Sequence, residues 1–218
     1  MRITTIEQQK KERGRRNLYV DGMFVASVST EVIMREGLRV GDPIDTPSIV
    51  RLCKTDEVIR TRNAAMRFLS YRPRTVHEVR ARLLSHGFVE QHIRTVITDL
   101  LAAGLLDDAA VARMVIRDAI SRRPVGQRVL KRKLSGMGIG AELSNTTLVE
   151  SLGDISQNEL AQRAAATYMR RRSRGRTTAE RQSVRAKLSQ FLGRRGFGWE
   201  EIRAVLKIYF DDTTEGEG

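Results

Sequence analysis

The sequence predicts a mainly α-helical protein in which three tandem three-helix repeats form an elongated, curved array, preceded by a small segment that contains a β-hairpin. Two observations support this fold class. A leucine followed four positions later by glycine and then by an apolar residue recurs at the same place in each of the three repeats, beginning at Leu83, Leu134 and Leu192. Apolar residues make up 40% of the 218 residues but aromatic residues only 5%, a composition that suits thin helical layers better than one thick core.

The clearest copy of the repeat lies in residues 71–88. Pro73 has no backbone N–H to donate and disfavours helix at the preceding residue, so an arriving helix should end there. Thr75 and Glu78 have the capping-box spacing, which begins a second helix. Gly87 should end that helix, because glycine tolerates the left-handed conformation of a helix C-terminus. A third helix follows, which gives a helix-turn-helix-turn-helix unit.

The unit recurs at shifts of 51 and then 58 residues. The first shift aligns Gly87 with Gly138, and the second aligns Gly138 with Gly196. The longer shift leaves seven extra residues near Thr177, which again has capping-box spacing with Glu180. We therefore expect the extra residues to lengthen the second helix of the third repeat by about two turns.

The remaining segments follow from turn and cap signals. Asp21-Gly22 between short apolar-alternating stretches predicts the hairpin, with a further short strand or extended segment around 38–44, and Pro47 begins a long helix. Asp107-Asp108 is interpreted as a helix cap rather than an acid–base pair. The predicted regions are a disordered basic tail (1–16), the hairpin with a short helix (17–46), the long helix leading into the first repeat (47–106), the second repeat (107–153), the third repeat (154–210) and an acidic tail (211–218).

Positive charge is concentrated in the predicted repeats. The formal net charge is +13, and residues 60–210 carry 29 Lys and Arg against 13 Asp and Glu, whereas residues 1–59 carry 10 against 9. Such a surplus indicates a polyanionic partner or an acidic protein surface.

Basic residues recur at the turn between the first and second helices of each repeat and along the second helix. In the second repeat, Lys133 lies on the same basic side of the second helix as Lys131 and Arg132. Solvated helix faces would give the same residue types, but the regular placement favours binding of a repeating polymer. The predicted partner-binding or nucleic-acid-binding residues are Arg72, Arg74, Arg80, Arg82, Arg122, Arg123, Arg128, Lys131, Arg132, Arg170, Arg171 and Arg172.

The sequence offers no basis for catalysis or for a cofactor. Cys53 is the only cysteine, which excludes a disulfide framework and a cysteine zinc site. The three histidines, His77, His86 and His92, lack acidic or cysteine partners at ligand spacing. No stretch has the length of a membrane span, and the polar N-terminus lacks the apolar core of a signal peptide. We expect a soluble, cytoplasmic, monomeric protein that is not an enzyme.

Four stretches carry a family resemblance. LSYRPRTVHEVRARLLSHGF, AGLLDD, RRPVGQRVLKRKLSGMGI and FLGRRGFGWEEI, in this order, resemble the RecX family of bacterial recombination regulators. The resemblance implies three tandem three-helix repeats and a bacterial cytoplasmic protein that binds the RecA recombinase filament and restrains its ATPase, strand-exchange and co-protease activities. One departure lies near Val111, where members often carry an aromatic residue.

Two other functions remain open. Three-helix units with a basic helix are also typical of helix-turn-helix proteins that bind DNA directly. The second helices carry few Asn or Gln at their start, which favours phosphate contacts to single-stranded or duplex DNA over sequence-specific readout. A scaffold that only bridges proteins is the third possibility.

Overall fold

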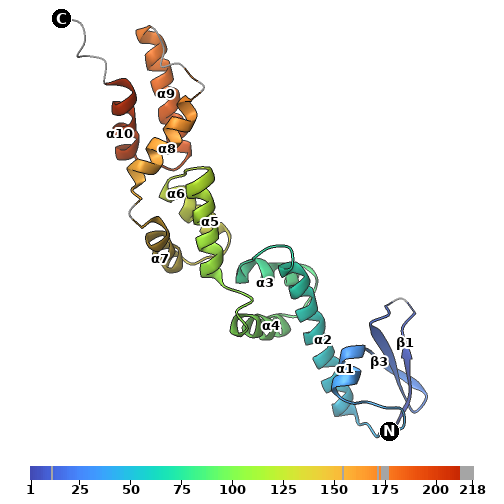
Figure 1. The fold of residues 1–218 in the computed structure, drawn as a ribbon. Helices are drawn as coiled ribbons and strands as arrows, with labels where there is room; N and C mark the ends of the chain where they lie inside the picture. Colours follow the sequence, from blue (N-terminus) through green and yellow to red (C-terminus); the bar gives the residue numbers. More distant parts are fainter. Residues whose placement is uncertain (11, 154, 171, 173–176, 212–218) are drawn as a thin grey trace, which may run out of the picture. The chain divides into compact units, whose positions relative to one another are not determined.

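A computed structural model describes residues 1–10, 12–153, 155–170, 172 and 177–211. The described residues are mainly helical, with one small antiparallel sheet near the N-terminus (Figure 1). The predicted acidic tail lies, except for Asp211, outside the described residues. The chain divides into two compact units, of which the first comprises Met1–Pro73 and Val79–Leu106 and the second Arg74–Glu78 and Asp107–Gly218.

Three strands form the sheet of the first unit. They pair antiparallel in the order β1-β2-β3, with bounds Ile3–Gln8 for β1, Arg15–Val20 for β2 and Met23–Ser29 for β3. Asp21 (φ 50°) and Gly22 (φ 80°) join β2 to β3 in the left-handed conformation that a two-residue hairpin turn requires. This confirms the predicted hairpin.

One prediction about this region is wrong. Residues 1–16 are not a disordered tail, because they contain β1 and the start of β2, and Ile3 is 1% exposed. A register shift between Ile3 and Thr5 breaks the alternation of apolar and polar residues in β1, which hides the strand from pattern analysis. The segment 38–44, expected to be a short strand or extended, forms one isolated bridge, between Arg2 and Pro43. The strand that completes the sheet beside the hairpin is β1.

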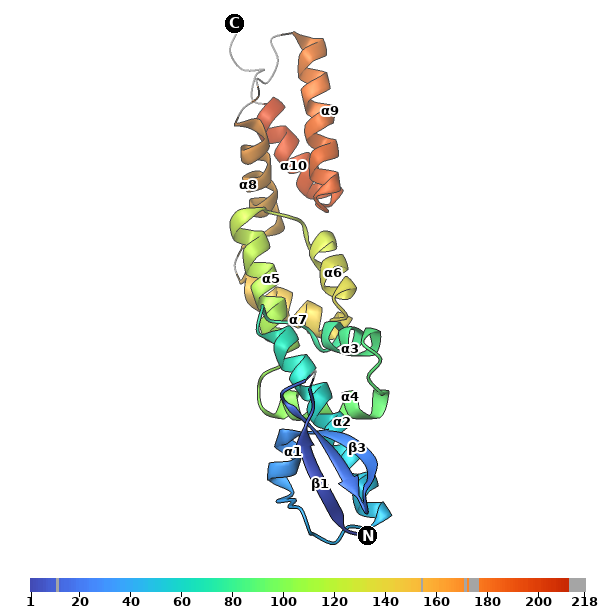
Figure 2. The same ribbon diagram turned by 90° about the vertical axis from the view of Figure 1, so that its right-hand side faces the viewer.

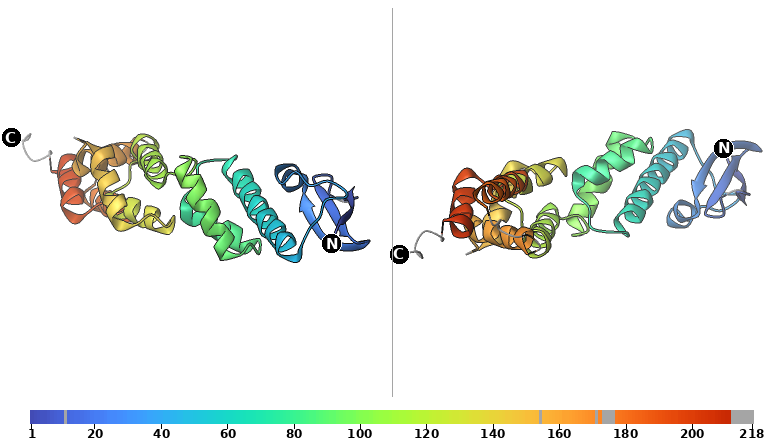
Figure 3. Two further views of the ribbon diagram at one scale, coloured as in Figure 1. Left: turned by 90° about the horizontal axis from the view of Figure 1, so that it is seen from below. Right: turned by 90° about the horizontal axis from the view of Figure 1, so that it is seen from above.

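Two helices pack against the sheet. Helix α1 spans Thr30–Arg35, and helix α2 spans Thr46–Leu69 with Asp45 as its N-cap and a proline in its first turn, as the sequence predicted. The two views of Figure 3 show the sheet, in blue, beside α2, in cyan. The buried apolar residues of this module are Ile3, Leu18, Val20, Ala26, Val28, Val32, Ile44, Leu52 and Ile59.

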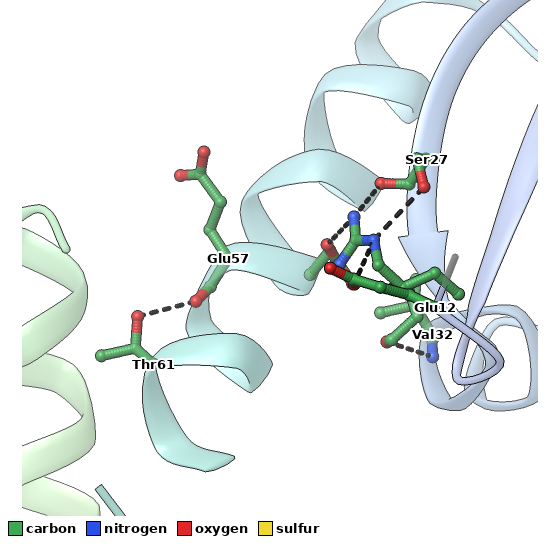
Figure 4. A network of polar contacts seen from close by, with 8 residues as sticks. Glu12, Ser27, Val32, Glu57 and Thr61 are labelled. Atoms are coloured by element: carbon green, nitrogen blue, oxygen red, sulfur yellow. Dashed lines mark hydrogen bonds and ion pairs between the residues drawn. The ribbon is translucent and has the colours of Figure 1, made fainter. Parts of the chain in front are cut away.

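A buried ion pair joins the sheet to α2. The Asp56 side chain, 4% exposed, accepts a hydrogen bond from the Arg15 guanidinium at 3.0 Å and another from the backbone N–H of Ser29 at 2.6 Å. Arg15 also donates to the carbonyl and hydroxyl oxygens of Ser27, which is labelled in Figure 4. Because both charges are hydrogen-bonded as well as paired, they can be withdrawn from water at this contact. The role of the pair is therefore to fix β2 and β3 on α2.

The remaining helices form the three-helix units. The last turns of α2 form the first three-helix repeat together with α3 and α4. Helices α5 to α7 form the second repeat, and α8 to α10 form the third. Their bounds are Val76–Ser85 for α3, Glu90–Ala102 for α4, Asp108–Arg122 for α5, Gln127–Gly136 for α6, Ala141–Leu152 for α7, Gln157–Met169 for α8, Thr178–Arg194 for α9 and Trp199–Phe210 for α10.

Equivalent positions of the three repeats have equivalent environments. Leu83, Leu134 and Leu192 are all 1% exposed or less. The glycines four residues after them have φ values of 79°, 78° and 83°, the left-handed conformation that ends each second helix. These values confirm the alignment of the repeats.

The seven extra residues of the third repeat lie in α9, as predicted. This helix has 17 residues, against 10 in α3 and in α6. Thr177 and Glu180 form a complete capping box at its start, and Leu188 and Leu192 remain buried on one face. Two extra turns preserve the inward face because seven residues are close to two full helical periods.

Each of the last two helical groups has its own apolar core. Figure 2 shows α8, α9 and α10 side by side. Their core contains Leu160, Ala161, Ala164, Ala165, Met169, Leu188, Leu192, Phe197, Ile202, Val205 and Leu206. The core of α5 to α7 contains Val111, Ala112, Val115, Ile116, Leu130, Leu134, Ile139 and Leu148.

Candidate partner interface

Helix α6 presents the most continuous set of the predicted cations. Leu130 and Leu134, four residues apart, point into the core, so the residues between them face solvent. Arg128, Lys131 and Arg132 are all exposed. Within the part of the chain that the structure describes, their side chains form no hydrogen bond or ion pair, so their charge is available to a partner.

The turn before α6 adds two exposed arginines. Arg122 pairs with Asp118 one turn earlier in α5, at 3.1 Å between nitrogen and oxygen, and Arg123 ends that helix. The following Pro124 is buried. The turn is therefore anchored by its proline and displays both guanidinium groups.

This turn is held in place by the turn between α9 and α10. The backbone N–H of Gly126 donates to the carbonyl of Arg195 at 2.8 Å, and the Arg195 guanidinium donates to the carbonyl of Pro124 at 3.1 Å. The two main chains approach so closely that a Cβ atom on Gly126 would overlap the carbonyl of Gly196. The basic turn of the second repeat is thus fixed to the α9–α10 turn of the third. We call this contact the Gly126 junction.

A contact of the same kind occurs one repeat earlier within the second unit. The hydroxyl of Thr75 donates to the carbonyl of Met137 at 2.7 Å, in the turn between α6 and α7. The repeat alignment places Thr75 on Gly126 and Met137 on Arg195, so this Thr75 junction is the counterpart of the Gly126 junction. Helix α6 runs from one junction to the other.

The predicted cations of the third repeat border an aromatic pair. Arg170 is exposed, and the guanidinium carbon of Arg172 lies 4.0 Å from the centre of the Tyr168 ring. That ring in turn lies 4.5 Å from the ring of Phe191. Arg171 lies outside the described residues. The cation–ring contact gives Arg172 a defined position at the end of α8.

Two predicted cations of the first repeat make contacts within the first unit. Arg80 pairs with Glu90 at 2.9 Å, and the guanidinium carbon of Arg82 lies 5.6 Å from the centre of the Phe68 ring. These contacts link α3 to its neighbours. The charges of Arg80 and Arg82 are therefore less available to a partner than those of the α6 cations.

The other two lie on either side of the boundary between units. Arg72, in the first unit, is exposed and its guanidinium donates to the carbonyl of Pro73 at 3.0 Å. Arg74, in the second unit, has a side chain only 18% exposed and pairs with Glu78 at 3.5 Å. Of these two, only Arg72 retains an exposed side chain.

Sequence reasoning missed the importance of Arg195. Its side chain spans the Gly126 junction, with its guanidinium carbon also 4.9 Å from the centre of the Phe191 ring. The alignment of Arg195 with Met137 could have pointed to a junction position. It could not have identified the carbonyl of Pro124 as the acceptor, because that contact joins residues 71 positions apart.

The described residues contain no group of three His, Cys, Asp or Glu that could hold a metal ion. His92 does lie beside a carboxylate, that of Glu57 in α2, at 3.2 Å, but the two form a pair and not a cluster. Burial raises the pKa of the Cys53 thiol, with smaller contributions from nearby carboxylates, which disfavours the reactive thiolate. Among the described helices, none combines the length and apolar character needed to cross a membrane.

Comparison with known families identifies the architecture. Residues 1–45 match the model of the regulatory protein RecX N-terminal domain, residues 62–100 that of the first RecX three-helix domain, and residues 157–206 that of the third. A solved structure described as the crystal structure of regulatory protein RecX is 25% identical, with a TM-score of 0.70, and the match covers 94% of this chain and 98% of that one. The RecX structure from Lactobacillus salivarius has a TM-score of 0.61 and 26% identity, covering 71% and 97% of the two chains.

Curated relatives give the same result. Regulatory protein RecX of Clostridium acetobutylicum is 29% identical over 210 residues, which cover 96% of this chain and 97% of the relative. Regulatory protein RecX of Halalkalibacterium halodurans is 32% identical over 176 residues, covering 79% of this chain and 65% of the relative. With three domain models matched in order and relatives aligned over nearly the full length, the chain belongs to the RecX family of regulatory proteins.

Proposed function

We propose that this protein regulates the bacterial RecA recombinase by binding the RecA–DNA filament and inhibiting its ATPase, strand-exchange and co-protease activities. The exposed cations Arg128, Lys131 and Arg132 on α6 carry the proposal, because no side chain among the described residues neutralises them. The family to which the chain belongs supports the choice of partner.

A rigid support for these cations favours binding to an ordered polymer. Both ends of α6 are tied by the Thr75 and Gly126 junctions, so the side chains start from a fixed helix and lose less freedom on binding. Several weak contacts made in parallel along a filament multiply through effective concentration. Affinity for the assembled filament should therefore exceed affinity for a free recombinase subunit.

Charge reversal on α6 tests this function. The double variant Arg128→Glu with Arg132→Glu should raise the concentration needed to inhibit recombinase ATPase by about tenfold or more, because two contacts become repulsive. The variant Arg185→Glu with Lys187→Glu, which makes the same charge change on exposed positions of α9, is the matched control. If both folded variants inhibit like the parent, the basic surface of α6 is only solvated and the proposal is wrong.

Direct binding to DNA through phosphates is the second candidate, favoured by the net charge of +13. In that case the affinity for bare single-stranded or duplex DNA should be independent of sequence, fall steeply with salt and match the affinity for filaments. Co-sedimentation with filaments and with bare DNA, run in parallel, separates the two functions.

A further inference from the structure

A pocket lies within the second unit between the last turn of α5, the turn that follows it and α6. Its volume is about 420 Å³, which lies in the range of roughly 300–1,000 Å³ typical of ligand pockets. The lining residues are Asp118, Ala119, Arg122, Arg123, Val125, Val129, Leu130 and Lys133.

The lining combines an apolar side with cations. Ala119, Val125 and Val129 contribute half-buried hydrocarbon side chains to it, whereas Leu130 is fully buried and offers no surface to a ligand. Arg122, Arg123 and Lys133 are exposed, and the single carboxylate of the lining, that of Asp118, already pairs with Arg122 at 3.1 Å. The pocket therefore offers an apolar surface with two further positive charges, those of Arg123 and Lys133.

The packing of the fold gives the pocket a defined shape. Leu130 is fully buried in the core of α5 to α7. The segment between the helices is fixed by the backbone bond of the Gly126 junction, and Val129 lies against Gly196 in that same contact. A preformed pocket does not have to be ordered when it binds, which favours affinity.

We propose that this pocket binds a segment of a protein partner in which an apolar side chain is flanked by carboxylates. Charge complementarity selects the carboxylates, which would meet Arg123 and Lys133, and the hydrocarbon lining selects the apolar anchor. A nucleic-acid phosphate fits less well, since a phosphate needs donors but gains nothing from three apolar side chains. If the proposed function holds, the segment belongs to the recombinase. The pocket would then recognise protein, while Arg128, Lys131 and Arg132 of α6 remain available to DNA phosphates.

The pocket can be tested without any filament. The probe is a short fluorescein-labelled peptide with a single Leu flanked on each side by Glu, titrated with the full chain and followed by fluorescence anisotropy. Ala119→Leu, which fills the pocket and leaves every charge in place, should weaken binding by about tenfold, the loss of one buried apolar anchor. The same peptide with Ser in place of Leu should bind the parent about as weakly.

Arg123→Glu with Lys133→Glu should weaken the peptide similarly and, being a change of exposed side chains, keeps the test decisive if Ala119→Leu does not fold. Arg185→Glu with Lys187→Glu on α9 is again the control of equal charge and should leave binding unchanged. The inference is overturned if the pocket variants bind the Leu peptide like the parent, or if the Leu and Ser peptides bind the parent equally well.

A second arm identifies the source of the ligand. Ala119→Leu should weaken binding to recombinase filaments by about tenfold while leaving binding to bare single-stranded DNA unchanged, because no cation is altered. Equal losses on filaments and on bare DNA would mean that nucleic acid occupies the pocket, which would overturn the inference. A parent that fails to bind filaments would refute the proposed function, while the peptide titration still decides the pocket.

Discussion

The two junctions of the second unit join neighbouring repeats at equivalent positions but use different hydrogen-bond donors. At the Thr75 junction, a side-chain hydroxyl reaches the carbonyl of Met137 at 2.7 Å. At the Gly126 junction, a backbone N–H reaches the carbonyl of Arg195 at 2.8 Å. The acceptor is the equivalent backbone carbonyl in both, but the donor is not.

The difference explains which residue each position tolerates. A hydroxyl carried on Cβ bridges a wider gap, and Thr75 uses it fully, donating to Met137 and accepting the N–H of Glu78 at 3.1 Å as a helix cap. A direct main-chain bond leaves no room for Cβ, so the corresponding position in the next repeat is Gly126. Equivalent positions in a repeat protein can therefore share a contact without sharing a residue type.

The largest expected effect comes from removing a core side chain of α6, the helix between the two junctions. Leu134 is fully buried in the last turn of α6, and its carbonyl accepts the N–H groups of Met137 and Ile139. Leu134→Ala should lower the free energy of unfolding by about 2–5 kcal/mol, through lost burial and the cavity it leaves. Urea denaturation measures the change. A loss below about 0.5 kcal/mol, as for a surface position, would refute the repeat alignment.

A smaller effect is expected from the Gly126 junction alone. Gly126→Ala should lower the free energy of unfolding by about 1–3 kcal/mol, because the new Cβ forces the two main chains apart. Gly140→Ala is the matched control, since Gly140 also caps a helix, α7, but has open space around its Cβ position. We expect the control to change stability by less than about 0.5 kcal/mol. Equal effects in urea melts would show that the close approach does not constrain this position.

The smallest effect of the three is expected from the Thr75 junction. Thr75→Val keeps the shape but removes the hydroxyl, which leaves the carbonyl of Met137 without this donor and α3 without its cap, at a cost of about 1–2 kcal/mol. Thr95→Val is the control, because the Thr95 hydroxyl is exposed on α4 and bonds only within its own helix. If the two variants have indistinguishable thermal midpoints, the hydroxyl does not link the repeats.

The helical part of the fold was predictable because its signals are local. Capping boxes at Thr75 and Thr177, and the glycine that ends each second helix, depend on residues three to five positions apart. Apolar residues four positions apart, such as Leu130 and Leu134, then define the inward face of each second helix. The N-terminal sheet was only partly predictable, because β1 is recognisable through its pairing with β2 and not through its own interrupted pattern.

The candidate site also has features that the local sequence predicts and features that it does not. Exposure of Arg128, Lys131 and Arg132 follows from the helical period of α6, which fixes them opposite Leu130 and Leu134. The ion pair of Arg80 with Glu90 does not follow from any local pattern, since it joins two helices. The pocket beside Ala119 likewise follows from no local pattern, because its lining comes from two helices and the turn between them.

The sequence by itself determined the repeat, the register of its helices and the surplus of positive charge in residues 60–210. Each of these depends on spacing along the chain or on composition. Only the tertiary structure decided which cations are left without an internal partner, and where two backbones meet closely enough to require glycine. Those outcomes depend on distances between residues far apart in sequence, such as Gly126 and Arg195, which are set when the apolar faces pack and not by any single segment.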